Sequence, residues 1–344
     1  MPYYKRDLNL PAKEALLNEV VEVVIENEFL RVRISAKGAE MQSIEQKGAG
    51  WTDASSEVIA AGEAGPADAE GGAGAADAQA GFERLWCADP AVWGRHAPIL
   101  FPLIGRLREG CYLLGGKRFD APTHGFCRDR VFAVERLSPT AVRFTTVDDA
   151  QTREAYPFAF SFSVEYALEG SAIVKTHRVE NRGGGAMPFE VGGHEAYAVR
   201  LLPGERMADY FVRFEGLDYL EAFGMDERGI LLLPKERIEL DAGCLRRTPE
   251  QLGLDTVVLE DVPGRKVTLG CDKSDHEVAV EFPDFPYLGI WTAQGKGEPR
   301  YLCIEPWSAL PDGHFASREF SEKPGVRTLA SGEVAELTYR MAFK

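Results

Sequence analysis

The chain has 344 residues, of which 45% are hydrophobic and 27% are charged, a composition typical of globular proteins. Its 39 basic and 54 acidic residues give a formal net charge of −15, which argues against nucleic acid or an anionic membrane as a partner. No apolar run reaches the roughly 18 residues of a membrane span. The first residues lack the apolar region of a signal peptide. Six irregularly spaced cysteines without a Cys-x-x-Cys pair favour a reduced, cytoplasmic protein.

The first residues carry little information. We interpret residues 1–19 as an N-terminal extension, in which Ala12–Leu17 has the composition of one short helical turn. From Val20 onward, apolar and polar residues alternate with period two, as in half-buried strands. This pattern predicts three strands, the last two at Leu30–Ile34 and Ala39–Ile44.

The composition then changes abruptly. Between Ala60 and Gly81, 16 of 22 residues are alanine or glycine, four are acidic and none is basic. Such a segment has few large side chains whose burial could offset the entropy lost on ordering. We therefore predict a surface insertion at about residues 48–82, in a loop between strands.

Strand signals dominate the remainder of the chain. A hairpin is predicted over Gly110–Phe119, around Gly115 and Gly116. Short apolar or alternating segments, separated by turn residues, occur at Val131–Val134, Ala141–Thr145, Phe158–Leu168, Ile173–Val179, Val257–Leu259, Val267–Leu269, Val278–Phe282, Leu288–Thr292, Leu302–Ile304 and Leu337–Phe343. This spacing predicts an all-β fold, an antiparallel sandwich or barrel. With no linker after residue 85, we expect one β domain over residues 20–344.

Several common motifs are absent. The sequence contains no phosphate-binding loop, no dinucleotide-binding glycine motif, no nucleophile elbow and no His-Glu-x-x-His. His124 and Cys127, with Cys303 far downstream, make only a weak zinc motif, because a second closely spaced pair is missing. The sequence therefore predicts neither a metal nor a cofactor.

The candidate functional residues lie in segments where a titratable residue follows an apolar strand and stands close to glycine or proline. These segments are Pro98–Arg106 (PILFPLIGR), Thr123–Asp129 (THGFCRD), Met187–Tyr197 (MPFEVGGHEAY) and Leu302–Asp312 (LCIEPWSALPD). Each residue taken alone is equally compatible with a solvated surface position. Together, two histidines, an arginine and a glutamate beside aromatic rings suit a neutral sugar, whose ring packs on aromatic faces and whose hydroxyls need hydrogen bonds.

With these strings the chain resembles the aldose 1-epimerase (mutarotase) family, in a bacterial branch with ILFPxIGR and HGFxRD motifs. The resemblance runs from about Val20 to the C-terminus, apart from the insertion, and implies a large antiparallel β-supersandwich that binds hexoses in an open groove. It also implies roles for six residues: His194 as general acid, Glu305 as general base, and Arg106, His124, Trp307 and, more loosely, Asp255 as sugar-binding residues.

The implied reaction interconverts the α and β anomers of a hexose. A base takes the proton of the C1 hydroxyl, an acid protonates the ring oxygen, and the ring opens and recloses on the other face. A carboxylate and an imidazolium suffice for these steps, without a metal, a cofactor or a covalent nucleophile.

The chain departs from the family pattern at Glu195 and at Ser308–Pro311, so the sugar itself stays open. Two alternatives remain. One is a hexose-6-phosphate epimerase, with Arg95, Arg106 and Arg128 as candidate phosphate ligands. The other is a catalytically weak sugar-binding or regulatory protein of the same fold. The sequence leaves the oligomeric state undetermined.

Overall fold

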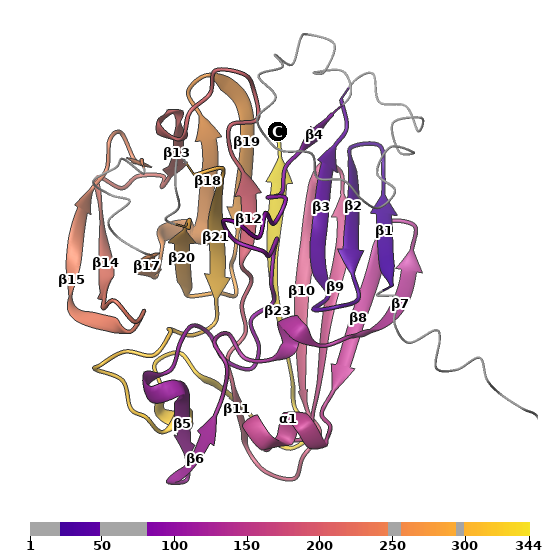
Figure 1. Cartoon of the computed structure of the whole chain (residues 1–344), viewed down its shortest axis with the longest axis vertical. Coiled ribbons are helices and arrows are strands. Elements are labelled where there is room, and N and C mark those ends of the chain that lie inside the picture. The colour runs from indigo at the N-terminus through magenta and orange to yellow at the C-terminus, as the bar shows by residue number, and fades with distance from the viewer. Residues whose placement is uncertain (1–20, 49–80, 247–255, 294–298) are drawn as a thin grey trace, which may run out of the picture.

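The computed structural model of the chain describes residues 21–48, 81–246, 256–293 and 299–344 (Figure 1). The proposed N-terminal extension with its helical turn at Ala12–Leu17, almost all of the Ala/Gly-rich insertion, and Asp255 lie outside the described residues. The described chain is mostly β-strand, and its strands pair antiparallel in large sheets. The predicted all-β class is therefore confirmed.

The first sheet contains the N-terminal strands that the alternating pattern predicted. Its order is β1 (Glu22–Glu26), β2 (Leu30–Ser35), β3 (Glu40–Gln46) and β4 (Phe82–Glu83). Gln46 pairs with Phe82 in an antiparallel register, so the two ends of the predicted insertion lie side by side.

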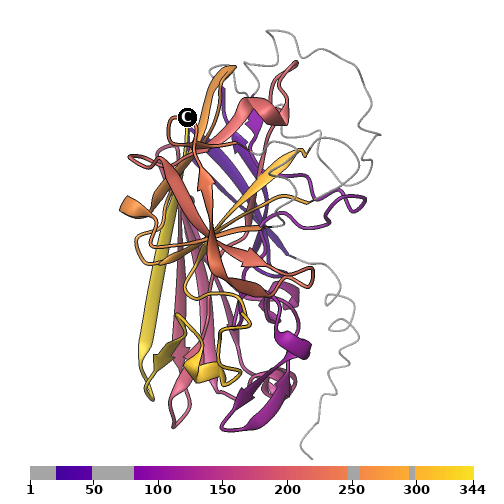
Figure 2. The same ribbon diagram turned by 90° about the vertical axis from the view of Figure 1, so that its left-hand side faces the viewer.

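The largest sheet has nine strands, and its central strands run along the long axis of the molecule (Figures 1 and 2). Its order is β16 (Cys244–Leu245), β13 (Tyr210–Arg213), β18 (Lys266–Cys271), β19 (Ser274–Glu281), β23 (Val334–Phe343), β10 (Ala172–Asn181), β9 (Phe160–Glu169), β8 (Ala141–Val147) and β7 (Ala133–Ser138). In β9 the alternate residues from Phe160 to Leu168 are all buried, because successive side chains of a strand face opposite sides of the sheet.

A six-stranded sheet carries most of the residues that concern function. Its order is β12 (Glu195–Ala198), β21 (Tyr301–Trp307), β20 (Tyr287–Trp291), β17 (Thr256–Glu260), β14 (Tyr219–Met225) and β15 (Leu231–Glu239). Strand β21 is buried along its whole length, and its side chains alternate between the core and the opposite face of the sheet. Leu302 and Ile304 belong to the main hydrophobic core.

Smaller elements complete the described chain. Two two-stranded sheets pair β5 (Cys111–Leu114) with β6 (Lys117–Asp120) and β11 (Met187–Phe189) with β22 (Arg327–Leu329). The first of these is the predicted hairpin around Gly115 and Gly116. Within the described ranges, α1 (Ala150–Ala155) is the single α-helix, and no helix there is long and apolar enough to cross a membrane.

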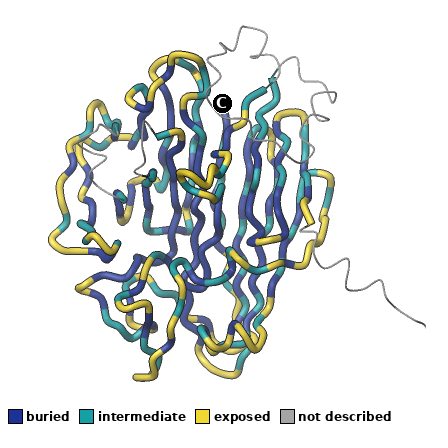
Figure 3. Tube along the Cα trace, viewed as in Figure 1, coloured by how far each residue is buried: buried dark blue, intermediate teal, exposed yellow. Residues whose placement is uncertain are grey.

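The sheets enclose one large hydrophobic core, shown by the buried inner strands in Figure 3. The core joins β1–β3, the middle of the nine-stranded sheet and the inner face of the six-stranded sheet. Tyr166 on β9 links two of these sheets, since its hydroxyl donates to the carbonyl of Ala39 at 2.7 Å. This packing of sheet on sheet leaves the other face of the six-stranded sheet free to line a pocket.

Candidate active site

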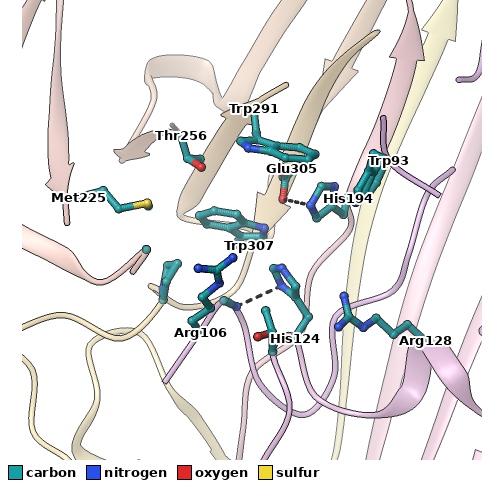
Figure 4. A pocket seen from close by; sticks show the side chains of 14 residues that line it. Trp93, Arg106, His124, Arg128, His194, Met225, Thr256, Trp291, Glu305 and Trp307 are labelled. Atoms are coloured by element: carbon teal, nitrogen blue, oxygen red, sulfur yellow. Dashed lines mark hydrogen bonds and ion pairs between the residues drawn. The ribbon is translucent and has the colours of Figure 1, made fainter. Parts of the chain in front are cut away.

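A cavity of about 420 Å³ lies against the six-stranded sheet and the loops beside it (Figure 4). Its walls are Trp93, Gly105, Arg106, Thr123, His124, Arg128, His194, Met225, Gly229, Thr256, Trp291, Glu305, Trp307 and Pro311. Five of the six residues assigned from the resemblance meet in this one pocket: His194, Glu305, Arg106, His124 and Trp307. The sixth, Asp255, lies outside the described residues, next to the pocket residue Thr256.

His194 and Glu305 come from neighbouring strands of the sheet. His194 immediately precedes β12, whose first residue, Glu195, is in register with Ile304 of β21. Glu305 follows Ile304 and faces the pocket, so its Oε2 lies 3.4 Å from His194 Nε2. Both residues are almost completely buried, with 7% and 1% of their surface exposed. A shared proton could therefore pass between them without contact with bulk water.

The two glycines before His194 are needed for close packing. Neither Gly192 nor Gly193 has a positive φ angle, so neither is needed for a left-handed turn. Instead, a Cβ on Gly193 would lie 2.0 Å from the hydroxyl of Tyr339, and one on Gly192 would lie 2.7 Å from Cδ1 of Trp307. The glycines let the backbone that carries His194 approach two aromatic side chains.

Trp307 lies over the sheet between two positions that lack side chains. Besides Gly192, the facing residue is Gly289 on β20, where a Cβ would come within 2.5 Å of the indole ring. The ring forms part of the pocket wall beside Glu305 (Figure 4). It offers the apolar surface on which a sugar ring can pack.

Two further tryptophans hold His194. The indole of Trp93 stacks on its imidazole, with ring centroids 5.0 Å apart and planes at 23°. Trp291 meets the same imidazole edge-on at 5.5 Å. These contacts fix the ring orientation and keep water away from His194 and Glu305.

Burial drives both members of the pair toward their neutral forms. It lowers the pKa of His194 to about 3, and the charges of Arg128 and Arg95 add to the shift. It raises the pKa of Glu305 well above its usual range, and Glu195 adds to that shift. The indole N–H of Trp307 opposes it, although its geometry falls short of a hydrogen bond. The unliganded pocket thus favours a carboxylic acid beside a neutral imidazole, rather than the carboxylate and imidazolium expected from the sequence.

His124 is fixed as a hydrogen-bond donor. The backbone N–H of Gly105 donates to its Nδ1 at 3.1 Å, so a neutral ring carries its proton on Nε2. Burial holds the pKa of His124 well below the usual value, helped by His194 and Arg128. The residue adopts a left-handed backbone conformation with φ of 63°, and its ring lies 5.5 Å from that of His194. Such strain is typical of residues positioned for function.

Two arginines enter the pocket at its rim. Arg106 is exposed, and its Nη1 donates to the carbonyl oxygen of Arg228 at 3.2 Å. Arg128 is half-buried, and its Nε is without a hydrogen-bond partner. Arg95, the third candidate phosphate ligand, does not line the pocket. Its guanidinium instead donates to the carboxylate of Asp129 at 2.7 Å.

The two departures from the family pattern differ in their positions. Glu195 points away from the pocket into the core between the sheets. There it accepts hydrogen bonds from Lys175 Nζ at 2.7 Å and from Tyr339 Oη at 2.5 Å. Adjacent strand residues face opposite sides, so Glu195 and His194 cannot share the pocket. In the other departure, Ser308 is buried and its Oγ accepts from the N–H of Val191, whereas Pro311 lines the pocket.

The fold also decides which side chains could meet at a metal ion. Cys127 is buried but does not join His124 and Cys303 in a ligand group. Within the described ranges, one group of possible ligand atoms forms instead: those of His194, Cys303 and Glu305 lie within 4.8 Å of one another.

Sequence reasoning did not assign several pocket residues. Trp93 and Trp291 come from different parts of the chain, and Met225 and Thr256 belong to no recognised motif. Pro311 lies in the candidate segment Leu302–Asp312 but was given no role there. The only available signal was the density of tryptophan and proline in the segment that contains Trp93.

Comparisons with known proteins identify the family of the chain. The model of the aldose 1-epimerase family matches residues 75–322, well over half of the chain. The chain therefore belongs to the aldose 1-epimerase family. Among curated proteins it is 29% identical over 276 residues to the chromosomal protein LacX of Lactococcus lactis, a match that covers 75% of this chain and 89% of LacX.

Solved structures of similar proteins show the same fold. A galactose mutarotase related enzyme from Lactobacillus acidophilus is 28% identical, with a TM-score of 0.80 and coverage of 94% of this chain and 97% of that one. A galactose mutarotase-like protein from Lactobacillus casei is also 28% identical, with a TM-score of 0.78 and coverage of 94% and 100%. The β-sandwich is therefore of the galactose mutarotase-like type, as the resemblance implied.

Proposed function

We propose that the protein is an aldose 1-epimerase that interconverts the anomers of a hexose, with His194 and Glu305 as its acid–base pair. The observation that carries this proposal is the buried pair itself, with 3.4 Å between Nε2 and Oε2 at the wall of a sugar-sized cavity. Ring opening needs one proton taken from the C1 hydroxyl and one given to the ring oxygen. His194 and Glu305 share one labile proton, so one of them can give a proton while the other takes one.

The bound sugar then decides where the proton lies. Hydrogen bonds from sugar hydroxyls to Glu305 favour its carboxylate, and the proton moves to His194. In the opening step, His194 gives this proton to the ring oxygen while Glu305 takes the proton of the C1 hydroxyl. After rotation about C1–C2, ring closure reverses both transfers, so the pair regains its starting protonation.

The remaining residues would orient the sugar. The neutral ring of His124 presents Nε2–H as a donor, and Arg106 brings charged donors to the rim. Trp307 supplies an apolar face for the C–H side of the ring. Orienting the reacting atoms against the pair is the main contribution that such residues make to catalysis.

Exchange between anomers, followed by NMR across a panel of hexoses and hexose phosphates, tests the proposal. We expect exchange of at least one sugar to exceed the uncatalysed rate and to depend on both His194 and Glu305. A protein that binds sugars but leaves every exchange rate unchanged would instead be the catalytically weak binding protein.

A hexose 6-phosphate is a second candidate substrate, because Arg106 and Arg128 both line the pocket. The positive charges of both arginines are felt inside the pocket, since they help to lower the pKa of His124. Phosphate prefers such guanidinium groups, although the net charge of −15 opposes an anionic ligand. If Arg128→Gln weakens turnover of glucose 6-phosphate but not of glucose, the phosphorylated sugar is the substrate.

The cellular setting is part of the proposal. We expect a small-molecule sugar as the partner, with no nucleic acid and no membrane involved. The six cysteines all lie among the described residues and form no disulfide there, which is consistent with a cytoplasmic protein.

A further inference from the structure

The thiol of Cys303 lies next to the proposed acid–base pair, on the same face of the sheet as Glu305. Cys303 and Glu305 are two residues apart on β21, so both side chains lie on one face of the sheet. Cys303 is completely buried, and its sulfur belongs to the group of three ligand atoms within 4.8 Å that also includes His194 and Glu305. The reaction proposed above gives this thiol no task.

We propose that His194, Cys303 and Glu305 form a binding site for a thiophilic divalent cation such as Zn²⁺ or Cd²⁺, whose occupation blocks the acid–base pair. The three side chains offer nitrogen, sulfur and oxygen, the donor set that zinc takes in proteins. One thiolate and one carboxylate balance the charge of a divalent ion, so the occupied site is neutral. This matters at a site that is almost completely buried.

The distance between two of the three ligand atoms already fits a tetrahedral centre. Zinc bonds of about 2.0–2.3 Å place neighbouring ligand atoms about 3.3–3.6 Å apart. The separation of 3.4 Å between His194 and Glu305 lies in this range. The sulfur of Cys303 lies within 4.8 Å of the other two ligand atoms, so it would have to move closer to them when an ion binds. The fourth position would face the cavity, where water or a sugar hydroxyl can bind.

The surroundings favour a soft ion. Cys303 packs in a small aromatic cluster with Trp86, Tyr301, Trp93 and Trp291, which limits the access of water. Mg²⁺ and Ca²⁺ prefer several oxygen ligands, and this site offers a single carboxylate. The site is therefore selective against the abundant hard cations.

The consequence for activity rests on the proposed function. A bound ion occupies the lone pairs of His194 and Glu305 through which protons would move. Zinc is thus expected to inhibit anomer exchange, and a chelator to restore it. Binding itself is measured without turnover, so a failure of the metal site and a failure of the epimerase proposal give different results.

The test titrates chelator-treated protein with Zn²⁺ against a chromophoric competitor, and with Cd²⁺ while the ultraviolet thiolate-to-cadmium band is followed. Cys303→Ala is compared with Cys127→Ala, a matched change at another buried cysteine near the pocket. We expect Cys303→Ala to weaken Zn²⁺ binding at least about tenfold and to remove the cadmium band. Cys127→Ala should leave both unchanged, and Mg²⁺ should not compete.

Three results would overturn the proposal: no Zn²⁺ binding by the unaltered protein, equal binding by Cys303→Ala, or a loss on Cys127→Ala as large as that on Cys303→Ala. If Cys303→Ala fails to fold, Cys303→Ser keeps a side chain of similar size with a poorer ligand. The same loss of affinity is then expected.

Discussion

The Nε2 atom of His194 and the Oε2 atom of Glu305 lie 3.4 Å apart, each almost completely buried, at the wall of the cavity beside the six-stranded sheet. The fold brings them together because β12 and β21 are neighbours in register. Burial disfavours a separated charge on either group. The distance and the burial together make one proton, shared by two residues, the central feature of the site.

The first prediction removes each member of the pair in turn. Glu305→Gln and His194→Asn should each slow anomer exchange at least about 100-fold, the usual contribution of general acid–base catalysis. Sugar binding should weaken less than turnover, because the lost interactions are strongest in the transition state. His276→Asn is the matched control, on β19 of the other large sheet and away from the pocket. If Glu305→Gln exchanges every tested sugar at the wild-type rate, the assignment is wrong.

The second prediction concerns pH. In the proposed mechanism the pair is active with one proton, so activity should fall when it gains a second proton or loses the first. Burial lowers the pKa of His194 to about 3, so the acidic limb should lie far below the usual titration range of histidine. Burial raises the pKa of Glu305, so the carboxyl keeps its proton above the usual range of an acid. The profile should be a broad bell, and residual activity of Glu305→Gln should show only one limb. Near-ultraviolet circular dichroism at each pH checks that the protein remains folded; an acidic limb near pH 6.5 would contradict the argument.

The alternating strands were the most predictable part of the fold. Phe160–Leu168 lies in β9 with every second residue buried, as the period of two predicted. Strand β15 escaped prediction because it is an edge strand whose burial is limited to Leu231 and Ile238. With so few buried residues, it leaves no hydrophobic period in the sequence. The strand predicted at Val131–Val134 is β7, which begins only at Ala133.

Five of the six residues assigned from the sequence line one pocket, but the environment of these residues was not predictable. The motifs predicted His194 and Glu305 at strand ends. His194 directly precedes β12, whereas Glu305 lies inside β21, which continues to Trp307. Nothing in the sequence showed that Trp93 stacks on the imidazole. The sequence predicted a carboxylate and an imidazolium. The observed burial is almost complete, and the second cause of the shift in Glu305 is Glu195, from the opposite face of the sheet.

A third prediction follows from the proposed chemistry, which gives proton transfer to side chains alone. Extensive chelation should leave anomer exchange unchanged, or raise it if the protein was isolated with a bound inhibitory ion. Exchange rates before and after treatment, with metal content measured on the same samples, provide the check. Activity that disappears with chelator and returns with one divalent ion would show that a metal takes part in the reaction.

The fourth prediction concerns the Ala/Gly-rich insertion. Gln46 and Phe82 are paired across β3 and β4, so the chain can close directly between them when residues 49–80 are removed. The removed segment is poor in large apolar side chains, so the deletion should change the melting temperature little. Removing the β5–β6 hairpin instead should lower it clearly, since Tyr112 is part of the hydrophobic core. A drop of many degrees on deletion of 49–80 would show that the insertion packs against the domain.

The fifth prediction tests why glycine precedes the histidine. In Gly193→Ala the new Cβ would lie 2.0 Å from the hydroxyl of Tyr339 and 2.6 Å from Oε2 of Glu195. One of these groups must move, and the hydrogen bond of 2.5 Å between them is disturbed in a fully buried place. Overpacking of this kind costs about 1–3 kcal/mol, so thermal unfolding should occur several degrees lower.

Gly184→Ala is the matched control, because no atom lies within 4 Å of its added Cβ and its φ angle is not positive. Its melting temperature should be unchanged or slightly higher. Equal melting temperatures for the two variants would mean that the space behind His194 can expand at no cost, and that the glycine is there for another reason.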